Sequence, residues 1–365
     1  MKLKDITLSI YDGKHGDCKD KDGSGVYFIS VKDLREYEID YSKARQIDEI
    51  EFEQNYKRTN LEAGDTIYAN TGDTIGKSLY VVDNPFVSKT SFQKSVAVVK
   101  PNQTLVDSKY LYYLLKYETP RLRKAATGSG QKNLLLSTMR EFEVSIHDRD
   151  FQEQIAMVLG TIDDKIRVNC KINDNLAAMA YDTYMHSFYG KKPNGKLDDI
   201  IIENEKSKVQ VGEAKDSDGD YPFFTSGEAI LSWNENFVEG RNCFLNTGGN
   251  ADVKFYVGKA AYSTDTWCIS ANQNLADYMY LLLLSIKPEL NKKFFQGTGL
   301  KHLQKPLLRD RPIYIPDKDE ISTFNSHVQH WFDIIAENTR ENQHLTALRD
   351  WLLPMLMNGQ ATISE

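Results

Sequence analysis

Two long segments of the chain repeat apolar residues at steps of three and four, which is the spacing of one face of an α-helix. No Pro or Gly interrupts residues 163–187, and Pro354 comes only near the end of the second segment. We expect two helices of roughly 35 residues, each about 50 Å long. The residues expected to pack along them are Ile155, Leu159, Ile162, Leu176 and Met179 in the first helix, and Phe324, Trp331, Leu345 and Leu348 in the second.

The apolar pattern is interrupted midway by Asn169 in the first segment and by Asn338 in the second. A buried Asn in a long helical seam fixes the register of the two helices at some cost in stability. Two Asn side chains on exposed faces are an equally open interpretation.

Short runs rich in Val, Ile, Tyr and Phe precede each long helix, bounded by Gly, Pro, Asn and Asp, and they are typical of strands. The runs are DTIYA (65–69), SLYVV (78–82), SVAVV (95–99) and FEVSI (142–146), then CFLN (243–246), KFYVG (254–258) and PIYIP (312–316). One further helix is expected at about 108–124. The pattern predicts an α+β chain divided at 1–150, 151–190, 191–317 and 318–365, in which each of two globular domains is followed by a long helix.

The two halves repeat one another. GSGQKNL, from Gly128, returns as GTGLKHL, from Gly297, and GDTIYANTGD, from Gly64, returns as GRNCFLNTGG, from Gly240. After the first of these motifs the offset of 169 residues holds without a gap for some sixty residues. The glycines at 128, 130, 297 and 299 are expected to supply positive φ angles in the turns. If the two helices run antiparallel, the duplication predicts pseudo-two-fold symmetry.

Composition fits a soluble globular protein of about two domains, with 41% hydrophobic and 27% charged residues among 365. The four cysteines lack C-x-x-C spacing and no apolar leader is present, which predicts a cytoplasmic protein. The longest apolar run, YMYLLLLSI, is too short to cross a bilayer, so no membrane partner is expected.

The net charge of −7 argues against a nucleic-acid partner, but its distribution argues for one. Residues 89–132 hold nine Lys and Arg against two acidic residues, and residues 287–311 hold seven against two. Both basic stretches contain one copy of the repeated glycine turn. Two solvated faces balanced by acidic segments are the competing interpretation.

No catalytic motif is complete. TGDTIGKS, from Thr71, nearly spells a phosphate-binding loop, but its two glycines are one residue too close together. DNPF, from Asp83, lacks a proline of the methyltransferase motif it approaches, and HVQH, from His327, lacks the Glu of a zinc-binding helix. The sequence predicts a non-enzymatic protein without a metal site.

The whole chain resembles the specificity subunit of type I restriction-modification systems. The resemblance rests on GDTIYANTGDTIGK, on GSGQKNLLLSTMREFEVSIHDRDFQEQIAMVLGTIDDKI and on the closing LTALRDWLLPMLMNGQ. The chain departs from the family in lacking Pro-Pro before the helix that begins with Glu-Gln, and its second copy lacks Glu-Gln.

The resemblance implies two target-recognition domains in tandem, at 1–150 and 191–317, whose helical spacers pack as an antiparallel coiled coil. Each domain would read one half of a bipartite double-stranded DNA target, and the helices would set the gap. Two modification (methyltransferase) subunits and restriction/translocase subunits would be partners. S-adenosylmethionine, ATP and Mg would be used by those partners, with no cofactor in this chain.

Candidate DNA contacts are polar or basic residues beside the glycine turns, since such side chains reach phosphates and base edges. They are Thr71, Thr74, Lys77, Lys89, Ser129, Gln131, Lys132 and Asn133 in the first domain, and Thr247, Asn250, Lys254, Thr264, Thr298, Lys301 and His302 in the second. The alternative function from another class is a protein-binding scaffold with two repeated domains, and a phosphate-using enzyme is a third.

Overall fold

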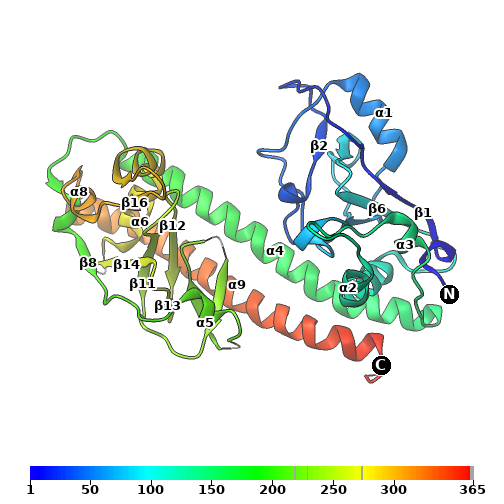
Figure 1. Ribbon diagram of the computed structural model, residues 1–365. Helices are drawn as coiled ribbons and strands as arrows, with labels where there is room; N and C mark the ends of the chain where they lie inside the picture. The colour runs from blue at the N-terminus through cyan, green and yellow to red at the C-terminus, as the bar shows by residue number, and fades with distance from the viewer. Residues whose placement is uncertain (218, 228, 273, 362–365) are drawn as a thin grey trace. The chain divides into compact units, whose positions relative to one another are not determined.

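The computed structural model describes residues 1–217, 219–227, 229–272 and 274–361, which form two compact units (Figure 1). Unit 1 comprises Met1–Arg167 together with the chain from His344 on, and unit 2 comprises Val168–Gln343. The two long helices are α4, Arg149–Ser187, and α9, Lys318–Met357. Helix α4 begins in unit 1 and ends in unit 2, whereas α9 begins in unit 2 and ends in unit 1. Each unit therefore contains part of both long helices.

Unit 1 is built on a four-stranded antiparallel sheet in the order β1-β6-β3-β4. The inner strands β3 and β6 are almost completely buried, which explains their continuous apolar sequences. Their bounds, with those of the outer strands, are β1 Thr7–Asp12, β3 Thr66–Ala69, β4 Ser78–Tyr80 and β6 Val96–Pro101. Three predicted strands, at 65–69, 78–82 and 95–99, are thus confirmed.

A short parallel pair and a helix lie beside this sheet. Strand β2, Tyr27–Ile29, pairs with β5, Thr90–Phe92. Helix α1, Glu49–Thr59, starts where the Asp48 side chain accepts a hydrogen bond from the backbone N–H of Ile50. It ends at Asn60 in the left-handed conformation, at φ 42°. Helix α1 was not predicted from the sequence, because its residues are mostly polar.

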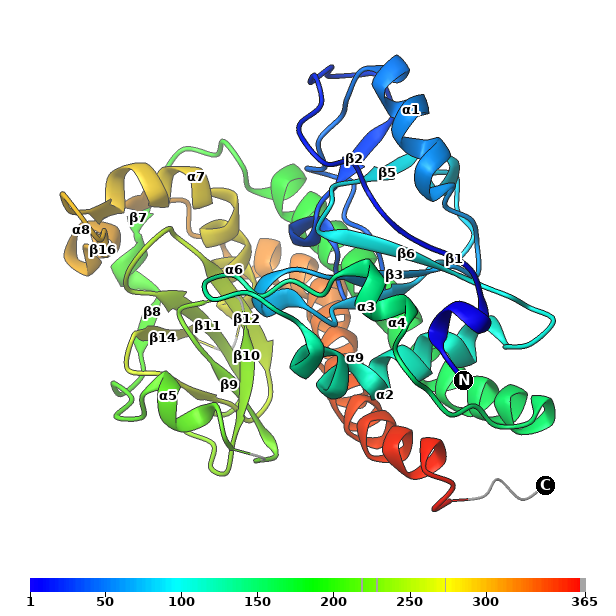
Figure 2. The ribbon, with the colours of Figure 1, turned by 45° about the vertical axis from the view of Figure 1, so that its right-hand side comes forward.

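Helix α2, Ser108–Ala125, packs between the sheet and the long helices (Figure 2). Its predicted bounds, 108–124, are confirmed, and Asp107 caps it by accepting from Tyr110 N at 2.9 Å. The short helix α3, Leu136–Arg140, follows it. The core of unit 1 joins α2, in which residues 110–115 are all buried, to Ile155 and Leu159 of α4 and to Leu353 of α9.

Unit 2 repeats the sheet of unit 1 strand for strand. Its four strands lie in the order β8-β14-β11-β12, and each occupies the place of the strand with the matching sequence in unit 1. A parallel pair, β9 with β13, again lies beside the sheet, and β10 extends it. The bounds are β8 Ile201–Glu203, β9 Tyr221–Phe224, β10 Ile230–Trp233, β11 Arg241–Asn246, β12 Val253–Val257, β13 Ala261–Tyr262 and β14 Thr266–Ala271.

Two short antiparallel strand pairs and four short α-helices complete the described part of unit 2. The pairs are β7 Gly195–Lys196 with β17 Pro312–Ile313, and β15 Phe295–Gln296 with β16 His302–Leu303. The helices are α5 Val211–Ala214, α6 Ala276–Ser285, α7 Lys287–Glu289 and α8 Lys305–Arg309. Helix α6 contains most of the run YMYLLLLSI and is buried nearly all round, so its sequence carries no helical period.

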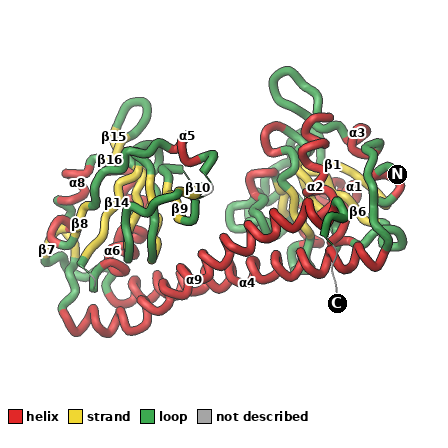
Figure 3. The backbone as a smooth tube through the Cα atoms, turned by 90° about the horizontal axis from the view of Figure 1, so that it is seen from below, coloured by secondary structure: helices red, strands yellow, loops and turns green. Residues whose placement is uncertain are grey.

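Helices α4 and α9 run antiparallel where they pack in unit 2 (Figure 3). Asn169 Nδ2 donates to Asn342 Oδ1 at 2.9 Å, and Asn338 Nδ2 donates to Asn173 Oδ1 at 2.8 Å. The rings of Phe188 and Phe324 meet farther along, with centroids 5.1 Å apart. Residue numbers therefore rise along one helix as they fall along the other. The two Asn pairs use equivalent positions of the repeat, so each is the counterpart of the other.

The predicted packing residues of the long helices divide into three groups. Buried are Ile155, Leu159, Ile162 and Phe324, and half-buried are Leu176, Trp331 and Leu345. Met179 and Leu348, at equivalent positions, are 48% and 45% exposed, so the prediction for them is wrong. Their neighbours Ala180 and Arg349 face the interior instead, which turns Met179 and Leu348 outward.

The predicted strand at 142–146 is also wrong. This segment makes backbone hydrogen bonds to the first residues of the chain, from Leu3 N to Phe142 O at 2.9 Å and from Val144 N to Met1 O at 2.8 Å. It forms only the isolated bridge between Lys2 and Glu143 and joins no sheet. Among the described residues, no helix combines the length and the apolar character that crossing a membrane requires.

Candidate nucleic-acid interface

In unit 1 two glycine-containing loops are joined by backbone hydrogen bonds. We call residues 70–74 the Asn-Thr-Gly turn and residues 127–133 the glycine hairpin. Thr127 and Asn133 exchange two backbone hydrogen bonds, of 2.7 and 3.0 Å, that close the hairpin. Gly72 N then donates to Lys132 O at 2.7 Å, and Leu134 N to Asn70 O at 2.8 Å. The repeated sequence motifs therefore form one surface.

Unit 2 joins its two equivalent loops in the same way. Its Asn-Thr-Gly turn is residues 246–250, and its glycine hairpin, residues 296–302, connects β15 to β16. Gly249 N donates to Lys301 O at 2.9 Å, and Leu303 N donates to Thr247 O at 3.0 Å. The register differs from that of unit 1 by one residue along the turn, while the hairpin positions correspond.

The first glycine of each hairpin is required by the backbone. Gly128 has φ +130° and Gly297 has φ +152°, and a Cβ on either would lie 2.5 Å from a backbone carbonyl oxygen. Those oxygens belong to Gln131 and Leu300, which are equivalent residues. Gly130 and Gly299 have no positive φ and open space around them, so the prediction of a backbone role for these two is wrong.

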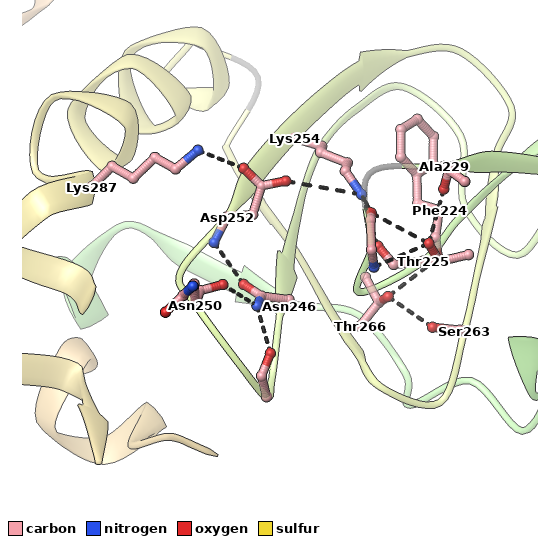
Figure 4. A network of polar contacts seen from close by, with 12 residues as sticks. Phe224, Thr225, Ala229, Asn246, Asn250, Asp252, Lys254, Ser263, Thr266 and Lys287 are labelled. Carbon is pink, nitrogen blue, oxygen red and sulfur yellow. Dashed lines mark hydrogen bonds and ion pairs between the residues drawn. The ribbon is translucent and has the colours of Figure 1, made fainter. Parts of the chain in front are cut away.

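A buried Asn fastens each Asn-Thr-Gly turn. Asn246 Nδ2 donates to Gly248 O at 2.7 Å, and Asn246 Oδ1 accepts from Asp252 N at 2.7 Å (Figure 4). The equivalent Asn70 is buried, and its side-chain oxygen accepts from Thr71 Oγ1 at 3.1 Å. Asn70 and Asn246 were not among the predicted contacts, although the Asn-Thr-Gly sequence, identical in both copies, was the signal for them.

Several predicted contacts lie on these joined loops. Thr71, Thr74 and Thr247 lie on the Asn-Thr-Gly turns, where their hydroxyls bond to nearby backbone or side-chain oxygens. Asn250 is exposed at the end of its turn. On the hairpins, Ser129, Gln131, Lys132, Asn133, Thr298 and His302 are exposed and Lys301 is half-exposed.

Four other predicted contacts lie elsewhere. Lys77 is exposed just before β4, with Nζ 3.5 Å from Val31 O, and Lys89 is exposed on a turn before β5. Thr264 is half-buried beside β13. Lys254 is a poor candidate, because its ammonium donates to the backbone carbonyls of Thr225 and Gly227 (Figure 4). It stabilises the loop between β9 and β10, and withdrawing it would leave those carbonyls unpaired.

Ion pairs neutralise much of the basic excess that the sequence indicated. In the second basic stretch the paired residues are Lys287 with Asp252, Lys293 and Arg311 with Glu289, and Lys305 and Arg309 with Glu203. In the first stretch they are Lys100 with Asp65, Lys109 with Asp164 and Arg121 with Glu118. Lys132 and Lys301 form no ion pair with any other described residue, so their charges stay available on the hairpins.

Each long helix is fastened to its unit through a carboxylate at the same position of the repeat. Asp164 of α4 accepts from Lys109 Nζ at 2.9 Å in unit 1. Asp333 of α9 pairs with Arg241 in unit 2, and Arg241 Nη1 also donates to the buried Asp277 at 2.8 Å. Burial raises the pKa of Asp277 to about 6, against the opposing effect of Arg241.

Unit 1 has a buried polar cluster where α9 meets α4. Arg349 Nη1 donates to Asp163 Oδ1 at 2.9 Å and to Tyr37 Oη at 2.6 Å. Tyr113 donates to the other oxygen of Asp163 at 2.7 Å, and burial together with that carboxylate raises its pKa. The equivalent positions in unit 2 are the apolar Ala180 and Phe332, so the cluster belongs to the first copy alone.

The motifs that approached catalytic signatures take other structures. TGDTIGKS forms a short 3₁₀ turn, Gly72–Thr74, that leads into strand β4, whereas a phosphate-binding loop leads into a helix. His327 and His330 are exposed on α9. Among the described residues no group of three or more His, Cys, Asp or Glu side chains is arranged to hold a metal ion.

The repeated sheets and their joined loops define a tandem-repeat α+β protein that presents one loop site on each repeat. Residues 2–178 and 191–346 match the family described as Type I restriction modification DNA specificity domain. The chain belongs to this family, because the two matches cover most of its length.

Two curated relatives cover most of the chain. The type I restriction enzyme MjaIX specificity subunit of Methanocaldococcus jannaschii is 24% identical over 410 residues, covering 100% of this chain and 93% of the relative. The HindI specificity subunit of Haemophilus influenzae is 28% identical over 406 residues, covering 82% and 87%. The crystal structure of a type I restriction-modification S subunit from M. genitalium covers 100% of this chain and 96% of its own, with a TM-score of 0.60 and 14% identity, and shows the same fold. The predicted resemblance to specificity subunits is confirmed.

Proposed function

We propose that this specificity subunit reads a bipartite double-stranded DNA sequence, with one half-site contacted by each unit. The observation that carries the proposal is the duplicated surface made by the Asn-Thr-Gly turn and the glycine hairpin. Each copy holds a Lys, Lys132 or Lys301, whose carbonyl is fixed by the turn and whose ammonium has no ionic partner among the described residues.

This geometry suits DNA for two reasons. A lysine that is unpaired in the free protein can neutralise a phosphate without first breaking an ion pair, so its charge contributes fully to affinity. The neighbouring hydroxyl and amide side chains can contact phosphates or base edges once the backbone is positioned. Phosphate contacts of the lysines would fix the register, and the other side chains would read sequence.

The long helices would set the unspecified gap between the half-sites. They have 39 and 40 residues, and a helix of that length extends about 60 Å. One turn of B-DNA is about 34–36 Å, so a gap of fixed length between two half-sites is a natural match for a rigid helical spacer. The Asn pairs in unit 2 support this role, since polar pairs in a helical seam disfavour sliding.

Two modification subunits would bind the exposed faces of the same helices. Met179 in unit 2 and Leu348 in unit 1 are about half exposed at equivalent positions, so an apolar side chain is available to a partner at the same place in each repeat. One equivalent site on each unit fits two copies of the partner. Adenine methylation with S-adenosylmethionine and ATP-driven translocation and cleavage with Mg would take place on the partner subunits.

The salt dependence of DNA binding tests the proposal. The chain would be co-purified with its modification subunit, and its affinity for a duplex carrying the recognised sequence measured between about 50 and 200 mM salt. We expect Lys132→Ala and Lys301→Ala each to weaken binding and to lower the slope of log K against log salt by about 1. Lys192→Ala removes an exposed lysine far along the chain from both hairpins and is the control. Unchanged slopes in both hairpin variants would contradict the proposal and favour a protein-binding scaffold.

A further inference from the structure

We infer that the side chain one residue past the midpoint of each glycine hairpin, Gln131 in unit 1 and Leu300 in unit 2, selects one base pair of its half-site; these two are called the tip residues. The inference rests on the proposed function and deepens it by naming specificity-determining residues. The two positions are equivalent in the repeat, being the third residue after Gly128 and after Gly297. Their chemistry is different, because one is an amide and the other a hydrocarbon.

The backbone that carries the two tips is the same. The tip carbonyl oxygen lies 2.5 Å from a Cβ built on Gly128 in unit 1 and on Gly297 in unit 2. The following lysine in each hairpin accepts a backbone hydrogen bond from the Asn-Thr-Gly turn, at 2.7 and 2.9 Å. The backbone conformation at this position is therefore the same in both units, and only the side chain differs.

Both tips also rest on equivalent glycines of the Asn-Thr-Gly turns. A Cβ on Gly72 would meet Gln131 Nε2 at 3.1 Å, and a Cβ on Gly248 would meet Leu300 Cδ2 at 3.8 Å. The absence of a side chain at these two glycines leaves room for the tip residue to lie across the turn.

Neither tip side chain has a role in stabilising the fold among the described residues. Leu300 is 66% exposed, although burying a leucine side chain is worth about 2 kcal/mol. Gln131 is exposed and its amide forms no hydrogen bond with another described residue. Both groups are therefore free to contact a ligand that approaches the hairpin.

Base-edge chemistry distinguishes the two. A Gln amide both donates and accepts, which matches N6 and N7 of adenine in the major groove, whereas a leucine offers only van der Waals contact and matches the methyl group of thymine. The adjacent lysine is the same in both hairpins and would contact phosphate regardless of sequence. Asn133, which also differs from its counterpart His302, is tied to Thr71 Oγ1 at 3.4 Å and is less available.

The test exchanges the two chemistries. The chain, co-purified with its modification subunit, would select bound duplexes from a randomised pool, and wild type would be compared with Gln131→Leu and Leu300→Gln. We expect Gln131→Leu to change the preference at one base pair of one half-site by about tenfold, and Leu300→Gln to do so at one base pair of the other half-site. The gap and the remaining positions should stay as in wild type.

Matched controls make the same exchanges at exposed positions outside the hairpins, Gln54→Leu on α1 and Leu8→Gln on β1. Retention of the wild-type sequence by both tip variants would overturn the inference while leaving the proposed function intact. A tip variant that co-purifies normally but selects no sequence would also overturn it. The tip side chain would then contribute to DNA affinity and not to discrimination between base pairs. If wild type itself selects no bipartite sequence, the proposed function fails with it.

Discussion

At the scale of single residues, the hairpin glycines show that a glycine repeated in the sequence is not always required by the backbone. Gly128 and Gly130 stand two residues apart in the same motif, as do Gly297 and Gly299, yet only the first of each pair has a positive φ and a carbonyl in the way of a Cβ. The repeat alone could not make this distinction, because all four glycines recur in register.

We predict that Gly128→Ala will lower DNA affinity, through the half-site that we propose unit 1 reads. The added methyl must move the carbonyl of Gln131 or strain φ, at a cost of about 1–3 kcal/mol. Gly130→Ala, with open space around it, is the matched control. Duplex binding and the thermal unfolding midpoint of both variants check the prediction, and equal behaviour of the two variants would contradict it.

Asp277 should make stability depend on pH. Its folded pKa, about 6, lies above the ordinary 3.8, so between these values the folded state binds the proton that the unfolded state has lost. The unfolding free energy from this group therefore falls as pH rises from about 4 to about 6, by up to about 3 kcal/mol.

Asp277→Asn removes this titration. The wild-type unfolding free energy minus that of the variant should decrease over the same pH interval, measured by denaturant unfolding at several pH values. A difference that stays flat, or one that increases with pH, would show that Arg241 keeps the carboxylate ionised.

At the scale of elements, the Asn pairs in the long helices should stabilise their packing. Asn169 is 1% exposed and its amide donates to Asn342 at 2.9 Å and to Glu341 at 2.6 Å. We expect Asn169→Ala to lower the free energy of unfolding by about 1–3 kcal/mol, because it leaves these partners without their donor.

Asn175→Ala, at an exposed position of the same helix, is the control and should change stability by less than about 0.5 kcal/mol. Thermal unfolding of the two variants gives the comparison. A larger loss for Asn175→Ala than for Asn169→Ala would show that the seam does not depend on this pair.

Elements with a strong period could be predicted from the sequence, and those shaped by tertiary contacts could not. The long helices followed from regular apolar spacing, and the inner strands followed from short β-branched runs. Helix α6 was missed because it is apolar on every side, and the segment at 142–146 has strand-like residues but pairs with the chain's first residues. In both cases tertiary packing decides the structure, and contacts between residues distant in sequence cannot be predicted from local propensity.

The position of the candidate site could be predicted from the sequence, but the contacts of its side chains could not. The repeat identified the loops, and the structure joins them in each unit. The positive charge available on the basic stretches was overestimated from the sequence. Lys305 and Arg309, for example, are paired with Glu203, which lies about a hundred residues away in sequence. Lys254 lies on β12, and its ammonium stabilises the β9–β10 loop through the carbonyls of Thr225 and Gly227. This role could not be predicted from its sequence position beside a glycine turn.

At the scale of the whole molecule, the duplication predicts that the two halves can be exchanged independently. Replacing residues 1–150 with those of a relative should change one specified block of the target and leave the other block and the gap unchanged. Binding-site selection with the chimera checks this, and simultaneous change of both blocks would contradict one half-site per unit.

The central claim is that this chain determines which DNA sequence the complex recognises. Methylation in cells tests it most directly. The chain would be co-expressed with a type I modification subunit that co-purifies with it, in a host without adenine methylation, and N6-methyladenine would be mapped across the genome. We expect methylation at two short specified blocks around a fixed gap, present only when this chain is expressed. Methylation that is absent, or that is the same without the chain, would contradict the claim.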